Sequence, residues 1–120
     1  MNNPFIYRHP NRRKKPKRHP EKELQIRCVE WFRKNHRNSL IVQVPNEACF
    51  NRASEFKKMG MLKGASDVYI VHRGQVLFVE FKAEDGSQSR EQRAFQHKVE
   101  ALGFKYYIIK SLEDFKDVIA

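Results

Sequence analysis

The sequence contains no hydrophobic run long enough to cross a membrane, and no segment of it resembles a signal peptide. Its two cysteines, Cys28 and Cys49, lie far apart and match neither a disulfide framework nor a zinc-binding spacing. These absences predict an intracellular protein in a reducing compartment, without a membrane partner.

Several kinds of chemistry also lack the residues that they need. The five histidines show no metal-ligand spacing, and there is no glycine-rich loop of the phosphate-binding type. No serine or cysteine has a nearby histidine and acid in the manner of a nucleophile triad. Zinc enzymes, nucleotide-binding loops and hydrolases that use a serine or cysteine nucleophile are therefore not indicated.

Positive charge is concentrated at the start of the chain. The 120 residues are enough for one domain and carry a formal net charge of +10. Residues 1–20 hold seven Lys or Arg, no acid and four of the five prolines, so we expect an extended, flexible tail rather than part of a core. The tail residues expected to grip nucleic-acid phosphates are Arg12, Arg13, Lys14, Lys15, Lys17 and Arg18. A solubilising or targeting tail is the alternative, because residues 14–18 also resemble a nuclear-import signal.

Two short hydrophobic runs rich in β-branched residues flank residues 72–74 and predict a β-hairpin. Asp67 precedes the first run, and Glu80 and Lys82 close the second. Because side chains alternate between the faces of a strand, Glu80 and Lys82 project from the same face, and pairing across the turn returns that face to Asp67. The sequence therefore predicts that two carboxylates and one amine meet beside a hydrophobic sheet.

These three charges have the composition of a metal-assisted hydrolytic site. Two carboxylates held together repel each other unless a positive charge lies between them, and Mg2+ is bound through one or two carboxylates plus phosphate and water oxygens. An adjacent lysine can orient or deprotonate a water molecule, as phosphodiester hydrolysis requires. The alternative is a simple ion pair of Glu80 with Lys82 at a strand end, a spacing that is common by chance.

Asp67, together with Glu80-Phe81-Lys82, resembles the signature of the PD-(D/E)xK nuclease superfamily. The segment Lys63-Gly64-Ala65-Ser66-Asp67 is similar to the Lys-Gly-x-Pro-Asp lead-in of its VRR-NUC branch, with Ser66 in place of the usual proline. The resemblance covers about residues 21–120 and implies a restriction-endonuclease-like core. It also implies a standalone protein of the phage or viral type, acting in the cytoplasm of a bacterial host.

The resemblance assigns roles to the residues of the hairpin. It implies that Asp67 and Glu80 hold Mg2+ or Mn2+ as catalytic ligands and that the Phe81 carbonyl adds a further ligand. It also implies that Lys82 positions the attacking water.

Two more roles come from the helices that the resemblance implies. A glutamate of the first helix joins the metal in this family, and we expect it to be Glu23, with Glu21 in reserve. From spacing alone, either acid could simply favour the positive N-terminus of the helix. Gln92 resembles the glutamine that the family places near the active lysine. The pattern Ser89-Arg90-Glu91-Gln92 is also that of a capping box, in which Gln92 would bond back to the Ser89 amide.

Hydrophobic periodicity and turn residues predict an α/β fold with a mixed central sheet flanked by helices. The second hairpin strand is apolar on both faces, which places it centrally in the sheet. We expect a basic tail at residues 1–20 and a nuclease domain at residues 21–120. The expected elements, in order, are a helix at 21–36, a strand at 40–44, a short helix at 53–59, the two hairpin strands, a helix from 89 to about 102, a strand at 104–109 and a helix at 112–119.

The connection before the hairpin is polar and carries Arg52, Lys57, Lys58 and Lys63. Because the last of these lead directly into the expected site, we expect a loop that faces a nucleic-acid substrate. A solvated face without a partner is the alternative.

These patterns predict a Mg2+- or Mn2+-dependent DNA endonuclease. The resemblance implies a structure-selective enzyme that acts on branched DNA such as Holliday junctions. Symmetric cutting of a four-way junction needs two sites, so a homodimer is expected with that substrate. The alternatives are a nuclease for flap or linear duplex DNA, and a non-catalytic nucleic-acid-binding module whose acids serve only structure.

Overall fold

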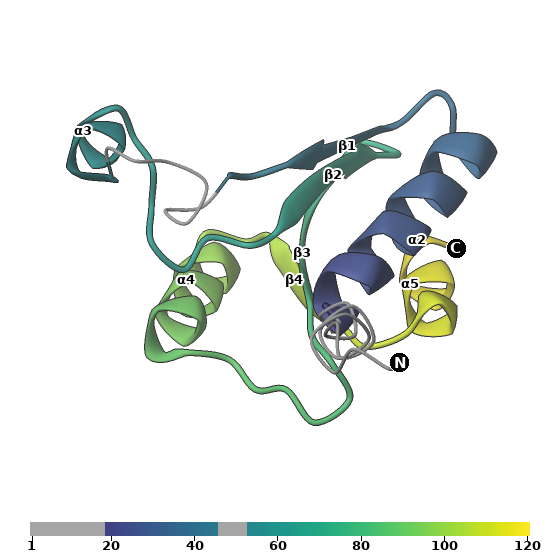
Figure 1. Ribbon diagram of the computed structural model, residues 1–120. Helices are drawn as coiled ribbons and strands as arrows, with labels where there is room; N and C mark the ends of the chain where they lie inside the picture. Colours follow the sequence, from purple (N-terminus) through teal and green to yellow (C-terminus); the bar gives the residue numbers. More distant parts are fainter. Residues whose placement is uncertain (1–18, 46–52) are drawn as a thin grey trace, which may run out of the picture.

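The computed structural model describes residues 19–45 and 53–120, so the six basic residues expected in the tail, and Arg52, lie outside the described residues. The chain alternates helices and strands in the order expected from the sequence (Figure 1). The elements are α2 Pro20–Asn35, β1 Leu40–Gln43, α3 Ala53–Lys58, β2 Val68–His72, β3 Gln75–Phe81, α4 Arg90–Ala101, β4 Lys105–Ile109 and α5 Leu112–Ile119.

The four strands form one mixed sheet in the order β1-β2-β3-β4. The first two pairs are antiparallel and the β3–β4 pair is parallel, because α4 crosses from the end of β3 back to the start of β4. β3 lies inside the sheet with a partner on each side, which confirms the central place expected from its two apolar faces. The predicted α/β class with a mixed sheet is therefore confirmed.

The hairpin between β2 and β3 turns through two residues rather than three. His72 is still part of β2 and pairs with Gln75, so its predicted place in the turn was wrong. Arg73 and Gly74 have φ angles of 51° and 75°, and a two-residue turn with two positive φ angles matches the twist of the strands that it joins. This turn fixes the register that brings the far ends of the two strands together.

Helices cover both faces of the sheet. α2 and α5 pack against each other on one face, while α4 lies on the other face beside β4 (Figure 1). Within residues 19–45 and 53–120, none of the helices combines the length and the apolar character that a membrane crossing requires.

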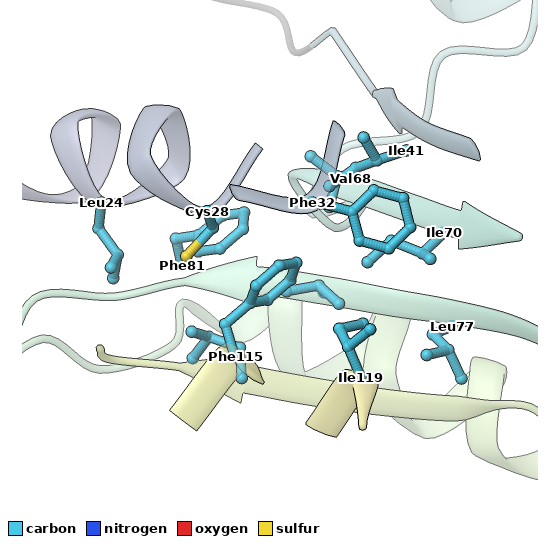
Figure 2. Close-up of a cluster of buried hydrophobic side chains, with 12 residues drawn as sticks. Leu24, Cys28, Phe32, Ile41, Val68, Ile70, Leu77, Phe81, Phe115 and Ile119 are labelled. Atoms are coloured by element: carbon cyan, nitrogen blue, oxygen red, sulfur yellow. The ribbon is translucent and has the colours of Figure 1, made fainter. Parts of the chain in front are cut away.

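The main core lies between the sheet and the α2–α5 layer (Figure 2). Leu24, Cys28 and Phe32 repeat at the spacing of one helical face and are buried, whereas Trp31 is only half-buried. Phe115 of α5 is completely buried and packs its ring against Phe32 and Phe81. The remaining buried members of this core are Ile41, Val68, Ile70, Leu77, Val79, Ile109 and Ile119.

We expect Phe115→Ala to lower the free energy of unfolding by about 3–5 kcal/mol, because it opens a cavity where two helices meet the sheet. Phe104→Ala is the matched control, since the Phe104 side chain is 45% exposed. Urea denaturation followed by circular dichroism measures both losses. Equal losses in the two variants would contradict this description of the core.

Candidate active site

Asp67 lies at the point where the chain enters β2, and the hairpin register places it opposite the end of β3. Val68 pairs with Val79, so the residue before Val68 lies across from Glu80. The Phe81 amide donates a hydrogen bond of 2.7 Å to Asp67 Oδ2. One oxygen of this carboxylate is therefore held by the backbone of the neighbouring strand.

Glu80 is a carboxylate buried almost completely, with 1% of its surface exposed. Its Oε1 accepts a hydrogen bond from the hydroxyl of Tyr106 on β4. Its Oε2 has no hydrogen-bond partner among the described residues and is shielded from solvent. Lys82 Nζ lies 3.7 Å from this oxygen, close enough for electrostatic attraction but beyond normal hydrogen-bond length. Among the described residues, Oε1 of Glu80 thus has a hydrogen-bond donor and Oε2 does not.

Tyr106 is set in place by the parallel strand pair. It lies beside Phe78 in the β3–β4 register, and its ring packs edge-on against Phe95 of α4 with the ring centroids 6.1 Å apart. Burial, followed by the hydrogen bond and the charge of Glu80, raises the pKa of the Tyr106 hydroxyl far above its usual range, while the Gln88 amide acts in the opposite direction. The hydroxyl therefore stays protonated and remains a donor to Glu80.

Burial and the neighbouring acids make Asp67 harder to ionise. The pKa of Asp67 rises to about 6, chiefly because the side chain is buried and further because of the charges of Glu80 and Glu21. The Phe81 amide and the charge of Lys82 oppose this rise. A carboxylate has a pKa near neutral where its negative charge is not balanced by positive charge. A bound cation would supply that positive charge.

Glu21, rather than Glu23, is the first-helix acid that lies at this place. Glu21 Oε2 accepts a hydrogen bond of 3.2 Å from the Ala83 amide just after β3, and its charge reaches Asp67. Glu23 is exposed, and two positions along a helix turn a side chain by about 200°, which takes it away from Glu21. The spacing of Leu24 and Cys28 in the sequence already favoured Glu21, because Glu21 shares their face of the helix and Glu23 does not.

The remaining hairpin residue, Phe81, has its side chain in the core and its backbone beside Asp67. The amide and carbonyl of one strand residue point to the same side, so the Phe81 carbonyl is directed toward the β2 side as well. This direction is the one that the predicted carbonyl ligand needs.

Gln92 lies in a complete capping box at the start of α4. The Ser89 amide donates to Gln92 Oε1 at 2.8 Å, and the Gln92 amide donates to Ser89 Oγ at 3.1 Å. Of the two interpretations of Gln92, the capping box is therefore the one that the hydrogen bonds support. Gln88, which sequence reasoning missed, is the glutamine whose side chain acts on Tyr106, and it also donates to Gln96 at 2.9 Å.

The lead-in to Asp67 is packed against the start of α4. Gly64 has a φ of +86°, and a Cβ there would lie 2.4 Å from the Glu91 carbonyl oxygen, so a larger residue would push the two segments apart. Ser66, in place of the proline of the resembling motif, is buried and donates through its hydroxyl to the Val68 carbonyl at 3.0 Å. The lead-in thus enters β2 with its polar side chain hydrogen-bonded.

The basic residues before the hairpin are not gathered around the acids. Lys57 and Lys58 are exposed on α3, which stands apart from the sheet (Figure 1). Lys63 is also exposed, four residues before Asp67. Their predicted contact with nucleic acid therefore stays a prediction, as does that of the basic residues outside the described ranges.

A groove of about 860 Å³ gives access to the site from the side of α2. Asp67 and Glu21 line it together, so a substrate or an ion can reach both acids. The other residues that line this groove are His19, Pro20, Lys22, Gln25, Ile26, Val29, Arg33, Ile41 and Gln43.

The donor set fits a hard cation rather than zinc. Within the part of the chain that the structure describes, no three His, Cys, Asp or Glu side chains lie close enough to form a preformed metal cluster. Asp67 and Glu80 nevertheless each keep one oxygen free of protein hydrogen bonds among these residues. Mg2+ needs only one or two carboxylates because water and phosphate oxygens complete its octahedron. The residues present therefore fit Mg2+ or Mn2+.

Comparison with known proteins identifies one family and solved structures with a similar fold. The model of the VRR-NUC domain family matches residues 11–113. A solved structure of a VRR-NUC domain protein has 22% sequence identity and a TM-score of 0.69, covering 86% of this chain and 87% of its own. A solved VRR-NUC domain has 18% identity and a TM-score of 0.61, with 85% and 96% covered. At these identities the two structures show the shared fold. Comparison with curated proteins gives no match.

In the absence of a cation, we expect ionised Asp67 to destabilise the protein. Its pKa is about 6 in the folded state against an ordinary 3.8, so the folded state binds the proton more tightly. Its contribution to stability is complete below the ordinary pKa and is lost as the pH rises through about 6. Asp67→Asn should therefore raise the free energy of unfolding at pH 7.5 by up to about 3 kcal/mol.

Urea unfolding in EDTA between about pH 4 and pH 8 tests this expectation. The gain of Asp67→Asn should shrink toward zero at the acid end of the series, where Asp67 of the folded wild type is protonated. A difference between the two proteins that does not change with pH would contradict the shifted pKa.

Proposed function

The chain belongs to the VRR-NUC domain family, a family of nucleases, and we propose that it is a Mg2+- or Mn2+-dependent endodeoxyribonuclease of branched DNA. One observation carries this proposal. Each of the two acids at the hairpin ends, Asp67 and Glu80, has one oxygen that accepts a hydrogen bond within the protein and one that accepts none from the described residues. The nuclease domain implies DNA as the partner.

In this proposal Asp67 and Glu80 hold the cation through their remaining oxygens, with the Phe81 carbonyl and the Glu21 carboxylate beside them. When bound, the cation would supply Lewis-acid stabilisation of the charge that develops on the phosphoryl group. The chain contributes the fixed positions of these oxygens, because strand pairing and the two hydrogen bonds hold each acid.

Lys82 positions the attacking water. Only 8% of its surface is exposed, and its ammonium group lies 3.7 Å from Glu80 Oε2. The ammonium group can donate to a water held beside Glu80 and can balance part of the negative charge of the acids. The backbone of Lys82 is fixed as an extension of β3, since its amide donates to the Ile109 carbonyl at 2.9 Å.

The substrate and the assembly rest on the resemblance to the standalone phage or viral type of the PD-(D/E)xK superfamily. That type acts on branched DNA such as Holliday junctions, and two symmetric cuts require two copies of the single site in this chain. We therefore propose a homodimer. The basic segment at residues 12–18 would add sequence-independent affinity through phosphate contacts.

We expect Asp67→Asn and Lys82→Ala each to lower the cleavage rate of a labelled four-way junction by at least about 100-fold in Mg2+. Each removes a group that acts on the reacting phosphate or water, whereas junction binding in EDTA should be retained. A panel of junction, flap and linear duplex at equal concentration identifies the substrate. Full cleavage by both variants would refute the site, and no cleavage of any substrate by the wild type would favour a binding module.

Glu21→Gln and Glu23→Gln separate the two glutamates of α2. The geometry predicts that Glu21→Gln raises the Mg2+ concentration needed for half-maximal cleavage by about tenfold, because Glu21 adds negative charge next to Asp67. Glu23→Gln, an equal change of charge on the same helix, should stay close to the wild type. Magnesium titrations of cleavage measure both. The reverse outcome would restore the assignment of Glu23 made from the sequence.

A further inference from the structure

Tyr106 is the group that decides which Glu80 oxygen is available. Its hydroxyl donates to Oε1, while Oε2 faces Lys82 without a hydrogen-bond partner among the described residues. The hydrogen bond occupies one lone pair of Oε1 and orients the carboxylate, so Oε1 is a weaker second ligand for an ion than Oε2. Tyr106 itself is 6% exposed and is packed against Phe95, so its hydroxyl has little freedom to leave Glu80.

Asp67 is limited in the same way by a different donor. Its Oδ2 accepts from the Phe81 backbone amide, so one oxygen of this acid is also engaged within the protein. Both acids that line the proposed cation site are thus set up as one-oxygen ligands. The donor to Asp67 belongs to the backbone and cannot be removed by substitution, whereas the donor to Glu80 is a side chain.

The number of oxygens that a carboxylate presents bears on which cation fits. Ca2+ takes six to eight oxygens in flexible geometry and often binds both oxygens of one carboxylate, whereas Mg2+ demands a near-ideal octahedron and keeps several waters. A pair of one-oxygen carboxylates suits the smaller ion. Such a pair does not offer Ca2+ a carboxylate that binds through both oxygens, which is the ligand that would raise the coordination number of Ca2+.

We propose that Tyr106 is a specificity-determining residue that makes Glu80 a one-oxygen ligand and so favours Mg2+ over Ca2+ at this site. This inference rests on the proposed function, because it concerns the same two acids. Tyr106 contacts a ligand of the cation rather than the substrate, so it is a positioning residue. Sequence patterns did not indicate it, since it lies on a different strand from the acids.

Tyr106→Phe tests the proposal because it removes the hydroxyl and keeps the ring that packs on Phe95. Tyr107→Phe is the matched control, the same change at the next residue of β4, whose side chain packs against the core on the opposite face. Mn2+ is bound to each protein and then displaced with Mg2+ or Ca2+ while free Mn2+ is followed by electron paramagnetic resonance. Circular dichroism and thermal unfolding establish that each variant is folded.

In the wild type, Mg2+ should displace Mn2+ at a lower concentration than Ca2+ does. In Tyr106→Phe the preference for Mg2+ over Ca2+ should fall by about tenfold, and in Tyr107→Phe it should be unchanged. The KM for DNA should stay constant in Tyr106→Phe while Ca2+ becomes a stronger inhibitor of Mg2+-supported cleavage. An unchanged preference in Tyr106→Phe would overturn the proposal.

Two results keep this test separate from the test of the proposed function. Asp67→Asn that still binds Mn2+ like the wild type would show that the cation site itself is misplaced, whatever Tyr106 does. If Tyr106→Phe does not fold, the affinities of the wild type for Mg2+ and Ca2+ test the proposal. A wild type that binds Ca2+ more tightly than Mg2+ would contradict the proposed role of Tyr106.

Discussion

The hydrogen bond from the Phe81 amide to the Asp67 carboxylate joins the two strand ends on which the site depends. It holds the residue before β2 against the last residue of β3, so Glu80 lies opposite Asp67 and Lys82 follows on the same face. The amide of Ala83, two residues after Phe81, donates a hydrogen bond to Glu21 and holds the start of α2 at the same place. Two amides near the end of β3, together with the hairpin register, thus set the relative positions of three acids and one amine.

The cost of this arrangement is electrostatic. Glu80 is buried, and one of its oxygens accepts no hydrogen bond from residues 19–45 or 53–120; a buried acceptor without a hydrogen bond costs about 1–3 kcal/mol. Burial and the neighbouring acids also oppose the ionisation of Asp67. The core between the sheet and the α2–α5 layer offsets this cost, and Val68, Val79 and Phe81, which lie next to the two acids in the sequence, are buried in it.

Much of the site could be predicted from the sequence because its residues lie on one hairpin. Strand alternation and the presence of a turn are local patterns, and they were sufficient to predict that Asp67, Glu80 and Lys82 lie near one another, although the turn was predicted one residue too long. The choice between Glu21 and Glu23 was also a local question, and helical spacing relative to Leu24 would have favoured Glu21.

Tyr106 could not be found in this way, because it contacts Glu80 across 26 residues and a parallel strand pair that no local pattern specifies. The extension of β2 through His72 was missed because the turn uses a positive φ at Arg73, which is uncommon outside glycine and asparagine.

The parallel pairing of β4 has a consequence for how the molecule forms. The β2–β3 hairpin needs only local contacts, whereas β4 reaches β3 after the chain has passed through α4, and such distant pairings form late because more chain entropy is lost. During folding the acids therefore meet before the tyrosine that orients one of them arrives. A chain in which only the β2–β3 hairpin has formed has the acidic groups but not their final arrangement. The site is therefore complete only when β4 pairs with β3.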